Sequence, residues 1–272
     1  MDIKAADVAK LRAMTGAGMM DCKKALVEAE GDFERAKDII REKGKLVAAK
    51  RADRHATQGV VTSKIVGQKG YMLCLACETD FVAQNADFVA AAKAILDIAV
   101  EADAENLEAL LAVVKDGKTV AEIVTEKSGQ TGEKVELAYY GKIEAPMCVT
   151  YIHMNSKLGT LIGFNKEIDK EVAKDVAMQA AAMAPVAIDK ADCDPKLIEH
   201  ERMIGREQAR QEGKPEAILD KIAEGKVNKF LNENTLLNQA LVKNNKITVG
   251  AYIKGADKDA TVVAYKRFSL ND

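Results

Sequence analysis

A weak internal repeat constrains the fold of this chain more than any other feature of its sequence. Residues 59–102 contain two strand-like apolar runs around a glycine-containing turn, then a loop with acidic residues and an Ala-rich helical stretch. Residues 147–183 repeat the same order. Helices rich in alanine can pack closely on a sheet or on another helix. We therefore expect an α+β fold with a duplicated antiparallel core, one lobe at 55–140 and the second at 141–272.

The first 54 residues predict a separate small helical domain. Three short apolar-periodic segments lie between residues 7 and 43, and the sequence predicts that the third segment ends at Gly44. So short a unit can bury only a small core, and such units commonly serve as recognition modules on a larger body. Residues 45–57 are rich in alanine and basic side chains, and we expect them to form a helical linker.

The second lobe contains a predicted helical hairpin at about 195–233. Gly213-Lys214-Pro215 interrupts it with a turn that no continuous helix would carry. Each arm has a narrow apolar stripe with charged flanks, which is typical of an antiparallel coiled coil that projects from the body. Apolar runs at 247–253 and 260–266 predict two closing strands.

The composition disfavours several classes of protein. Charged residues make up 30% of the 272 residues, but the net charge is only −2, without the basic excess of a nucleic-acid-binding domain. The sequence has no apolar run near the roughly 20 residues that span a bilayer, and its N-terminus lacks the layout of a signal peptide. We therefore expect a cytoplasmic protein without a nucleic-acid or membrane partner.

Two patterns that suggest enzyme chemistry are incomplete. Cys74 and Cys77 form a CxxC pair, but they lie at the end of a predicted strand, where residues three apart point to opposite faces. A thiol oxidoreductase remains an alternative on this pair. Gly16 and Gly18 follow a predicted helix rather than the strand that a dinucleotide fingerprint requires. The sequence therefore predicts no cofactor, no metal site and no small-molecule substrate.

The connection at 77–83 is the most distinctive short motif. It reads CETDFVA and joins a buried strand to a predicted helix, a place where scaffolds present contact residues. Phe81 could fill the core under the helix, since phenylalanine is often buried, or it could be presented to a partner. The second copy of the repeat has Glu167-Ile168-Asp169 at this place, so the fold does not require an aromatic side chain there. This difference favours a functional role for Phe81.

Two motifs together resemble the translation elongation factor Ts family. They are TGAGMMDCKKAL at 15–26 and ETDFVA at 78–83. The N-terminal domain, at 1–54, resembles the family's three-helix ubiquitin-associated-type domain. The two lobes resemble its duplicated core, and the hairpin at about 195–233 resembles its coiled coil.

The resemblance implies a guanine-nucleotide exchange factor for elongation factor Tu that has no active site of its own. In the family, the segment that matches 79–82 enters the GTP-binding domain of the partner. There the aromatic side chain wedges between helices and dislodges the Mg²⁺ that holds GDP. The matching residues in this sequence are Thr79, Asp80, Phe81 and Val82.

The resemblance also implies further contacts with the partner. Arg12, Met19 and Met20 match the N-terminal contact with the same GTP-binding domain, and His153 matches a histidine in the second-lobe hairpin. Many members of the family continue into a C-terminal helix, whereas this sequence ends at Asp272. We therefore expect the N-terminal domain and the core to provide the binding.

One further alternative for the function concerns the N-terminal domain alone. A ubiquitin-associated-type adaptor would bind a peptide or small protein with residues 1–54 and would use the remainder as a scaffold. This alternative leaves the motif at 79–82 without a role.

Overall fold

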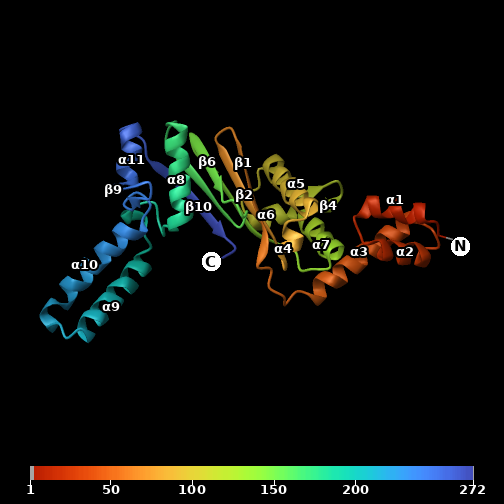
Figure 1. The fold of residues 1–272 in the computed structure, drawn as a ribbon, viewed down its shortest axis with the longest axis horizontal. Helices are drawn as coiled ribbons and strands as arrows, with labels where there is room; N and C mark the ends of the chain where they lie inside the picture. Colours follow the sequence, from red (N-terminus) through yellow and green to blue (C-terminus); the bar gives the residue numbers. More distant parts are fainter. Residues whose placement is uncertain (1–2, 272) are drawn as a thin grey trace.

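The computed structural model describes residues 3–271. Figure 1 shows an elongated molecule with the N-terminal helices at one end and two sheets in the middle. At the other end, helices α9 (Pro195–Gln211) and α10 (Glu216–Asn234) form a projecting hairpin. The mixed helix and strand content and the antiparallel sheets confirm the α+β class.

Three helices form the N-terminal bundle: α1 (Ala5–Thr15), α2 (Met19–Glu28) and α3 (Phe33–Lys50). Their small core is built around Leu11, Cys22 and Leu26. The Asp32 side chain accepts hydrogen bonds from two backbone N–H groups in the first turn of α3, an N-cap of the expected type. We use the name N-terminal module for this bundle.

Helix α3 is longer than the sequence predicted. It runs through Gly44 to Lys50, so the prediction that the third helix ends at Gly44 was wrong. The same helix therefore includes the first part of the expected linker. Gly44 is buried and lies against the backbone of Gly129 in helix α7 (Val120–Thr131). The missing side chain serves a close helix crossing here rather than a helix end.

The middle of the chain folds into a three-stranded antiparallel sheet with helices on its outer face. The sheet order is β1-β2-β5. Helices α5 and α7 cover a core that includes Leu73, Leu75, Phe88 and Ile95. Besides α7, this part of the chain contains β1 (Gln58–Val66), β2 (Lys69–Cys77), α4 (Asp80–Ala83), α5 (Ala86–Ala102), α6 (Leu107–Ala112), β3 (Val114–Lys115), β4 (Lys118–Thr119) and β5 (Glu136–Glu144).

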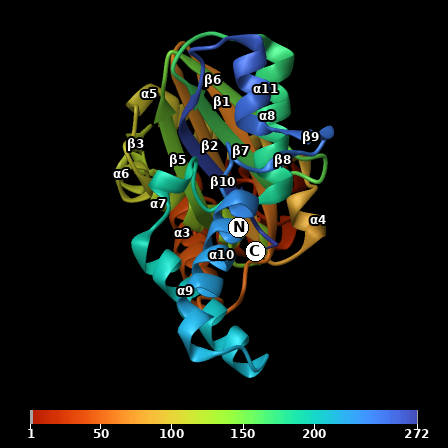
Figure 2. The same cartoon turned by 90° about the vertical axis from the view of Figure 1, so that its left-hand side faces the viewer.

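The rest of the chain forms a second antiparallel sheet, in the order β10-β7-β6. Helices α8 and α11 pack on its outer face (Figure 2). Besides the α9–α10 hairpin, this part of the chain contains β6 (Met147–Ile152), β7 (Leu158–Phe164), α8 (Lys170–Met183), the short 3-10 helix η1 (Lys190–Asp192), β8 (Ala240–Leu241), β9 (Asn244–Thr248), α11 (Val249–Ala256) and β10 (Val262–Ser269).

One predicted strand, at 247–253, was wrong. Most of this segment is helix α11, because Thr248 accepts a hydrogen bond from the Ala251 backbone N–H and so caps a new helix. Val249 and Ile253 are buried while Ala251 is exposed, which is a helical and not an alternating pattern.

The two sheets pack face to face. Their shared core includes Val61, Met72, Cys74 and Leu161. Gly159 makes this approach possible, because an added Cβ would lie 2.7 Å from the sulfur of Met72. The molecule therefore has four layers, helix, sheet, sheet and helix, and the N-terminal module is attached to the first helical layer.

Candidate partner-binding site

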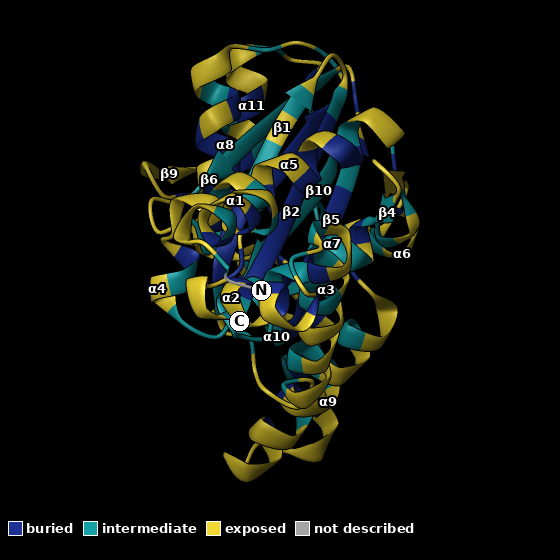
Figure 3. Ribbon diagram, turned by 90° about the vertical axis from the view of Figure 1, so that its right-hand side faces the viewer, coloured by how far each residue is buried: buried dark blue, intermediate teal, exposed yellow. Residues whose placement is uncertain are grey.

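The segment at 79–82 leaves strand β2 and turns at once into the short helix α4. The Thr79 hydroxyl accepts a hydrogen bond from the Val82 backbone N–H, 3.4 Å away, and so caps this single turn. The turn points the Phe81 side chain outward, and it is 85% exposed. Figure 3 shows α4 on the surface beside the buried strand β2.

Of the two interpretations of Phe81, the core interpretation is wrong. Phe88, in the first turns of α5, fills the core position under the helix and is 2% exposed. Burying a phenylalanine side chain typically stabilises a fold by about 1.5–3 kcal/mol, and this fold forgoes that stabilisation at Phe81.

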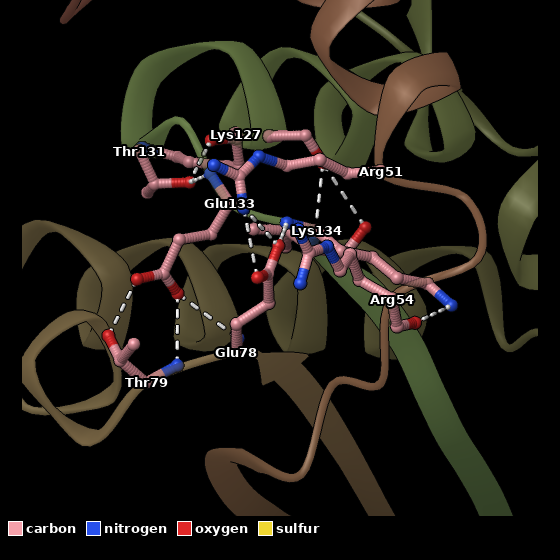
Figure 4. A network of polar contacts seen from close by, with 10 residues as sticks. Arg51, Arg54, Glu78, Thr79, Lys127, Thr131, Glu133 and Lys134 are labelled. Atoms are coloured by element: carbon pink, nitrogen blue, oxygen red, sulfur yellow. Dashed lines mark hydrogen bonds and ion pairs between the residues drawn. The ribbon is translucent and has the colours of Figure 1, made fainter.

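A carboxylate from a distant part of the chain holds the base of this turn. Glu133, in the loop between α7 and β5, accepts three hydrogen bonds (Figure 4). The donors are the backbone N–H groups of Glu78 (3.1 Å) and Thr79 (3.0 Å) and the Thr79 hydroxyl (2.6 Å). Hydrogen bonds to an ionised acceptor are stronger than neutral ones, so the start of the turn is firmly fixed.

A second carboxylate continues this network toward the N-terminal module. Both oxygens of Glu78 accept from one guanidinium nitrogen of Arg51, at 2.8 and 2.9 Å, and one also accepts from the Lys134 backbone N–H at 2.6 Å. The Lys134 N–H and the Arg51 guanidinium lower the pKa of Glu78 below its ordinary value. Glu78 is therefore ionised at neutral pH and can bind Arg51 as an ion pair.

A cleft of about 1480 Å³ separates the N-terminal module from helices α4 and α5. Arg12 and Met19 line it from the module, and Phe81 and Val82 line it from the opposite side. Met20 is not among the lining residues, but it follows Met19 on α2 and is 63% exposed. The structure thus brings Arg12, Met19, Phe81 and Val82 to one cleft, whereas Met20, Thr79 and Asp80 do not line it.

His153 lies outside this cleft, in the exposed turn between β6 and β7. Its Nδ1 is 2.9 Å from the Tyr151 hydroxyl. The same turn is tied to the first sheet, because Ser156 accepts a hydrogen bond from the Val61 backbone N–H at 2.7 Å. Strand β1 begins opposite Cys77, so His153 lies at the end of the sheet from which the 79–82 segment emerges.

Comparison with known proteins gives the family. The model of the family described as Elongation factor TS matches residues 78–272. The elongation factor Ts of Porphyromonas gingivalis is 47% identical over 272 residues, which cover 100% of this chain and 99% of that protein. The elongation factor Ts of Cytophaga hutchinsonii is 48% identical over 275 residues, and the one of Bacteroides fragilis is 40% identical over 327 residues. Each alignment covers 99% of this chain and 99% of the relative. This chain belongs to the elongation factor Ts family.

Membership in the elongation factor Ts family has a direct functional consequence. It makes the chain an elongation factor of protein biosynthesis that acts in nucleotide exchange and is not a catalytic enzyme. The family match starts at Glu78, the first residue of the ETDFVA motif, while the full-length relatives extend the similarity across the N-terminal module.

The cysteine pair does not have the properties of a redox site. Cys74 faces the core between the sheets and Cys77 faces the core under α5, on opposite sides of β2. Burial raises the pKa of each thiol to about 12, so the reactive thiolate is scarce at neutral pH.

Among residues 3–271, the side chains of His, Cys, Asp and Glu form no group of three that could hold a metal ion. Nor is any helix in the described part of the chain long and apolar enough to cross a membrane.

The residues that hold the 79–82 segment in place could not be predicted from the sequence. Glu133 is 54 positions from Thr79, and nothing in the residues around it marks a contact with this turn. In the sequence, Arg51 is one of several basic residues of the expected linker at 45–57. Of the anchoring residues, only Glu78 belongs to a distinctive motif, ETDFVA.

Proposed function

We propose that this chain is the guanine-nucleotide exchange factor of elongation factor Tu. In this proposal the 79–82 segment enters the GTP-binding domain and dislodges the Mg²⁺ that holds GDP. The observation that supports the wedge is the exposed Phe81 side chain on a capped and anchored turn. A residue that is free in solution and rigidly placed can be buried in a partner without first leaving a core.

The energetics of this action are those of linkage. Exchange factor and nucleotide each weaken the binding of the other to the GTPase by the same factor. Every tenfold loss of GDP affinity requires about 1.4 kcal/mol of coupling. A buried aromatic anchor can supply about 2 kcal/mol or more of binding free energy. Displacement of Mg²⁺ removes a concentrated positive charge from the phosphates, and GTP later displaces the factor through the same linkage.

The other expected contacts would bind the partner from elements other than α4. We propose that Arg12, Met19 and Met20 contact the same GTP-binding domain from across the cleft. The soft, polarisable side chains of methionine suit such adaptable surfaces. His153 contacts the partner from the β6–β7 turn.

We assign each predicted domain a separate role in this function. Residues 1–54 form a ubiquitin-associated-type domain that contributes affinity, 55–140 carry the wedge, and 141–272 form the second lobe. The α9–α10 hairpin is a coiled coil, with apolar contacts along its inner side and ion pairs such as Arg202–Glu224 across it. The cytoplasmic location stays a prediction.

Release of labelled GDP from elongation factor Tu tests this function. The wild-type chain should accelerate release strongly, and Phe81→Ala should lose most of the acceleration. Val242→Ala, a truncation at another exposed apolar residue, is the control and should behave as wild type. If the chain binds elongation factor Tu without accelerating release, the ubiquitin-associated-type adaptor is the better description.

A further inference from the structure

The contacts around residues 78, 79 and 133 have a consequence beyond the wedge itself. We infer that Glu133 is the positioning residue for Phe81 and that the Arg51–Glu78 ion pair couples Phe81 to the N-terminal module. This inference rests on the proposed function, because it assigns the residues that prepare the wedge for insertion.

The first step is the geometry of Glu133. Its two oxygens accept from two consecutive backbone N–H groups and from the Thr79 hydroxyl, so Thr79 is held by both its main chain and its side chain. The same hydroxyl caps α4, the turn that carries Phe81. The direction of Phe81 therefore depends on Glu133 through a chain of two hydrogen bonds.

The second step is the chemistry of the acceptor. Three donors converge on this side chain, and a carboxylate offers two acceptor oxygens where an amide offers one. Glutamine at position 133 would turn one acceptor into a donor, so the side chain could no longer accept from all three donors. The substitution Glu133→Gln therefore changes the contact while it preserves the shape of the side chain.

The third step is the connection to the module. Arg51 directly follows Lys50, the last residue of α3, and its guanidinium binds Glu78, the residue before Thr79. Lys134 adds a second tie, since its ammonium donates to the Arg54 carbonyl while its backbone N–H donates to Glu78. Figure 4 shows these side chains meeting between the end of α3, the start of α4 and the loop before β5.

The two ties have different consequences for exchange. Loss of the Glu133 contact frees the wedge, which lowers the rate of GDP release from the complex. Loss of the Arg51 contact leaves the wedge in place but loosens it relative to the module, which weakens binding because the two contact patches no longer act as one preorganised surface.

The first experiment needs no partner. The chain contains no tryptophan, so Phe81→Trp introduces a single fluorescent reporter at the tip of α4. In this background Glu133→Gln should lower the fluorescence anisotropy of the free protein, because the turn gains motion on the nanosecond timescale. Glu101→Gln removes an exposed carboxylate that pairs with Lys115 elsewhere on the surface, and it should leave the anisotropy unchanged.

The second experiment measures GDP release against factor concentration, with Phe81 intact. Glu133→Gln should lower the maximal rate about tenfold, with a smaller change in the half-saturating concentration. Arg51→Gln should raise the half-saturating concentration about tenfold and keep most of the maximal rate. Glu101→Gln should match the wild type in both quantities.

The outcomes separate this inference from the proposed function. Unchanged anisotropy together with an unchanged maximal rate in Glu133→Gln would overturn the positioning role. Equal effects of Glu133→Gln and Arg51→Gln on both kinetic quantities would overturn the division between them. If wild type does not accelerate GDP release, the proposed function fails, while the anisotropy still tests the anchor. Should Glu133→Gln fold poorly, Thr79→Val removes both contacts of the hydroxyl, the bond to Glu133 and the cap of α4, and should lower the anisotropy in the same direction.

Discussion

Gly44 of α3 and Gly129 of α7 bring two helix backbones into direct contact. A Cβ added at Gly129 would overlap the Cα of Gly44, whereas one added at Gly44 would lie 3.5 Å from the Cα of Gly129. The contact is reinforced by the Arg41–Glu126 ion pair and by a hydrogen bond from the Gln130 side chain to the Thr15 carbonyl. The N-terminal module is therefore docked on the core rather than loosely tethered to it.

This asymmetric contact predicts unequal effects of two similar substitutions. Gly129→Ala should destabilise the docked module by about 1–3 kcal/mol, because the new methyl group meets backbone that cannot move aside. Gly44→Ala should be neutral or stabilising by up to about 1 kcal/mol, because alanine favours the helix and the nearest atom is at an ordinary distance. Urea unfolding and limited proteolysis at residues 51–57 measure the two effects. Equal destabilisation by both substitutions would show that the close crossing is not a determinant of docking.

The contrast between Phe81 and Phe88 predicts a separation of stability from exchange. Phe88→Ala should cost about 3–5 kcal/mol of unfolding free energy, because it empties a core position. Phe81→Ala should melt near wild type and yet lose much of its exchange rate. Exchange by Phe81→Ala should also depend less on free Mg²⁺, since in the proposed mechanism Phe81 supplies the displacement of the metal. Thermal unfolding and GDP release at several Mg²⁺ concentrations are the measurements. A lowered melting temperature with normal exchange per folded molecule would remove the wedge from the mechanism.

The methionine pair on α2 predicts an effect on affinity alone. Met19→Ala and Met20→Ala should each raise the half-saturating concentration for GDP release about 5–30-fold, which corresponds to about 1–2 kcal/mol of binding free energy. The maximal rate should stay near wild type, because Phe81 is untouched. Met203→Ala, at an exposed methionine of α9, is the matched control. A fall in the maximal rate with unchanged half-saturation would instead place these methionines in the exchange step.

The buried thiols predict a specific pH dependence of chemical modification. With pKa values raised to about 12, Cys74 and Cys77 hold a thiolate fraction on the order of 10⁻⁴ at pH 8. Because burial raises these pKa values, reactivity toward a disulfide reagent should stay low at pH 8 and rise with pH. Cys148 is partly exposed and should react before them. Mass mapping after brief labelling identifies the modified residues, and unfolding in urea should expose the rest. Insulin reduction by the native chain that is lost in the Cys74→Ser, Cys77→Ser double variant would restore the oxidoreductase alternative.

The sequence predicted the features of the fold that depend on local patterns. The hairpins around residues 67–68 and 153–157, the Ala-rich helices and the interrupted helical hairpin all appear near their predicted places. Each follows from apolar periodicity and turn residues that neighbours in the chain supply. The strand predicted at 247–253 was wrong beyond Thr248, because this residue ends strand β9 and at the same time caps helix α11.

Features that depend on distant contacts were not predictable in the same way. Gly44 carries the local signature of a helix end, yet α3 runs through it, and its close contact with the backbone of Gly129, far along the chain, could not be predicted from neighbouring residues. The exposure of Phe81 could be argued from the second copy of the repeat, but its anchor Glu133 could not. A single glutamate in a polar loop has no sequence pattern that reveals its partner.

The unbroken helix α3 has a consequence for how this surface can evolve. Its 18 residues span about 27 Å, and Arg51 fastens its far end beside the wedge. One residue inserted into α3 would turn the module by about 100° relative to Phe81 and shift it by about 1.5 Å. In the proposed mechanism, the length of α3 sets the spacing between the two surfaces that contact the partner. Substitutions at exposed positions of α3 should therefore be tolerated better than insertions or deletions within it.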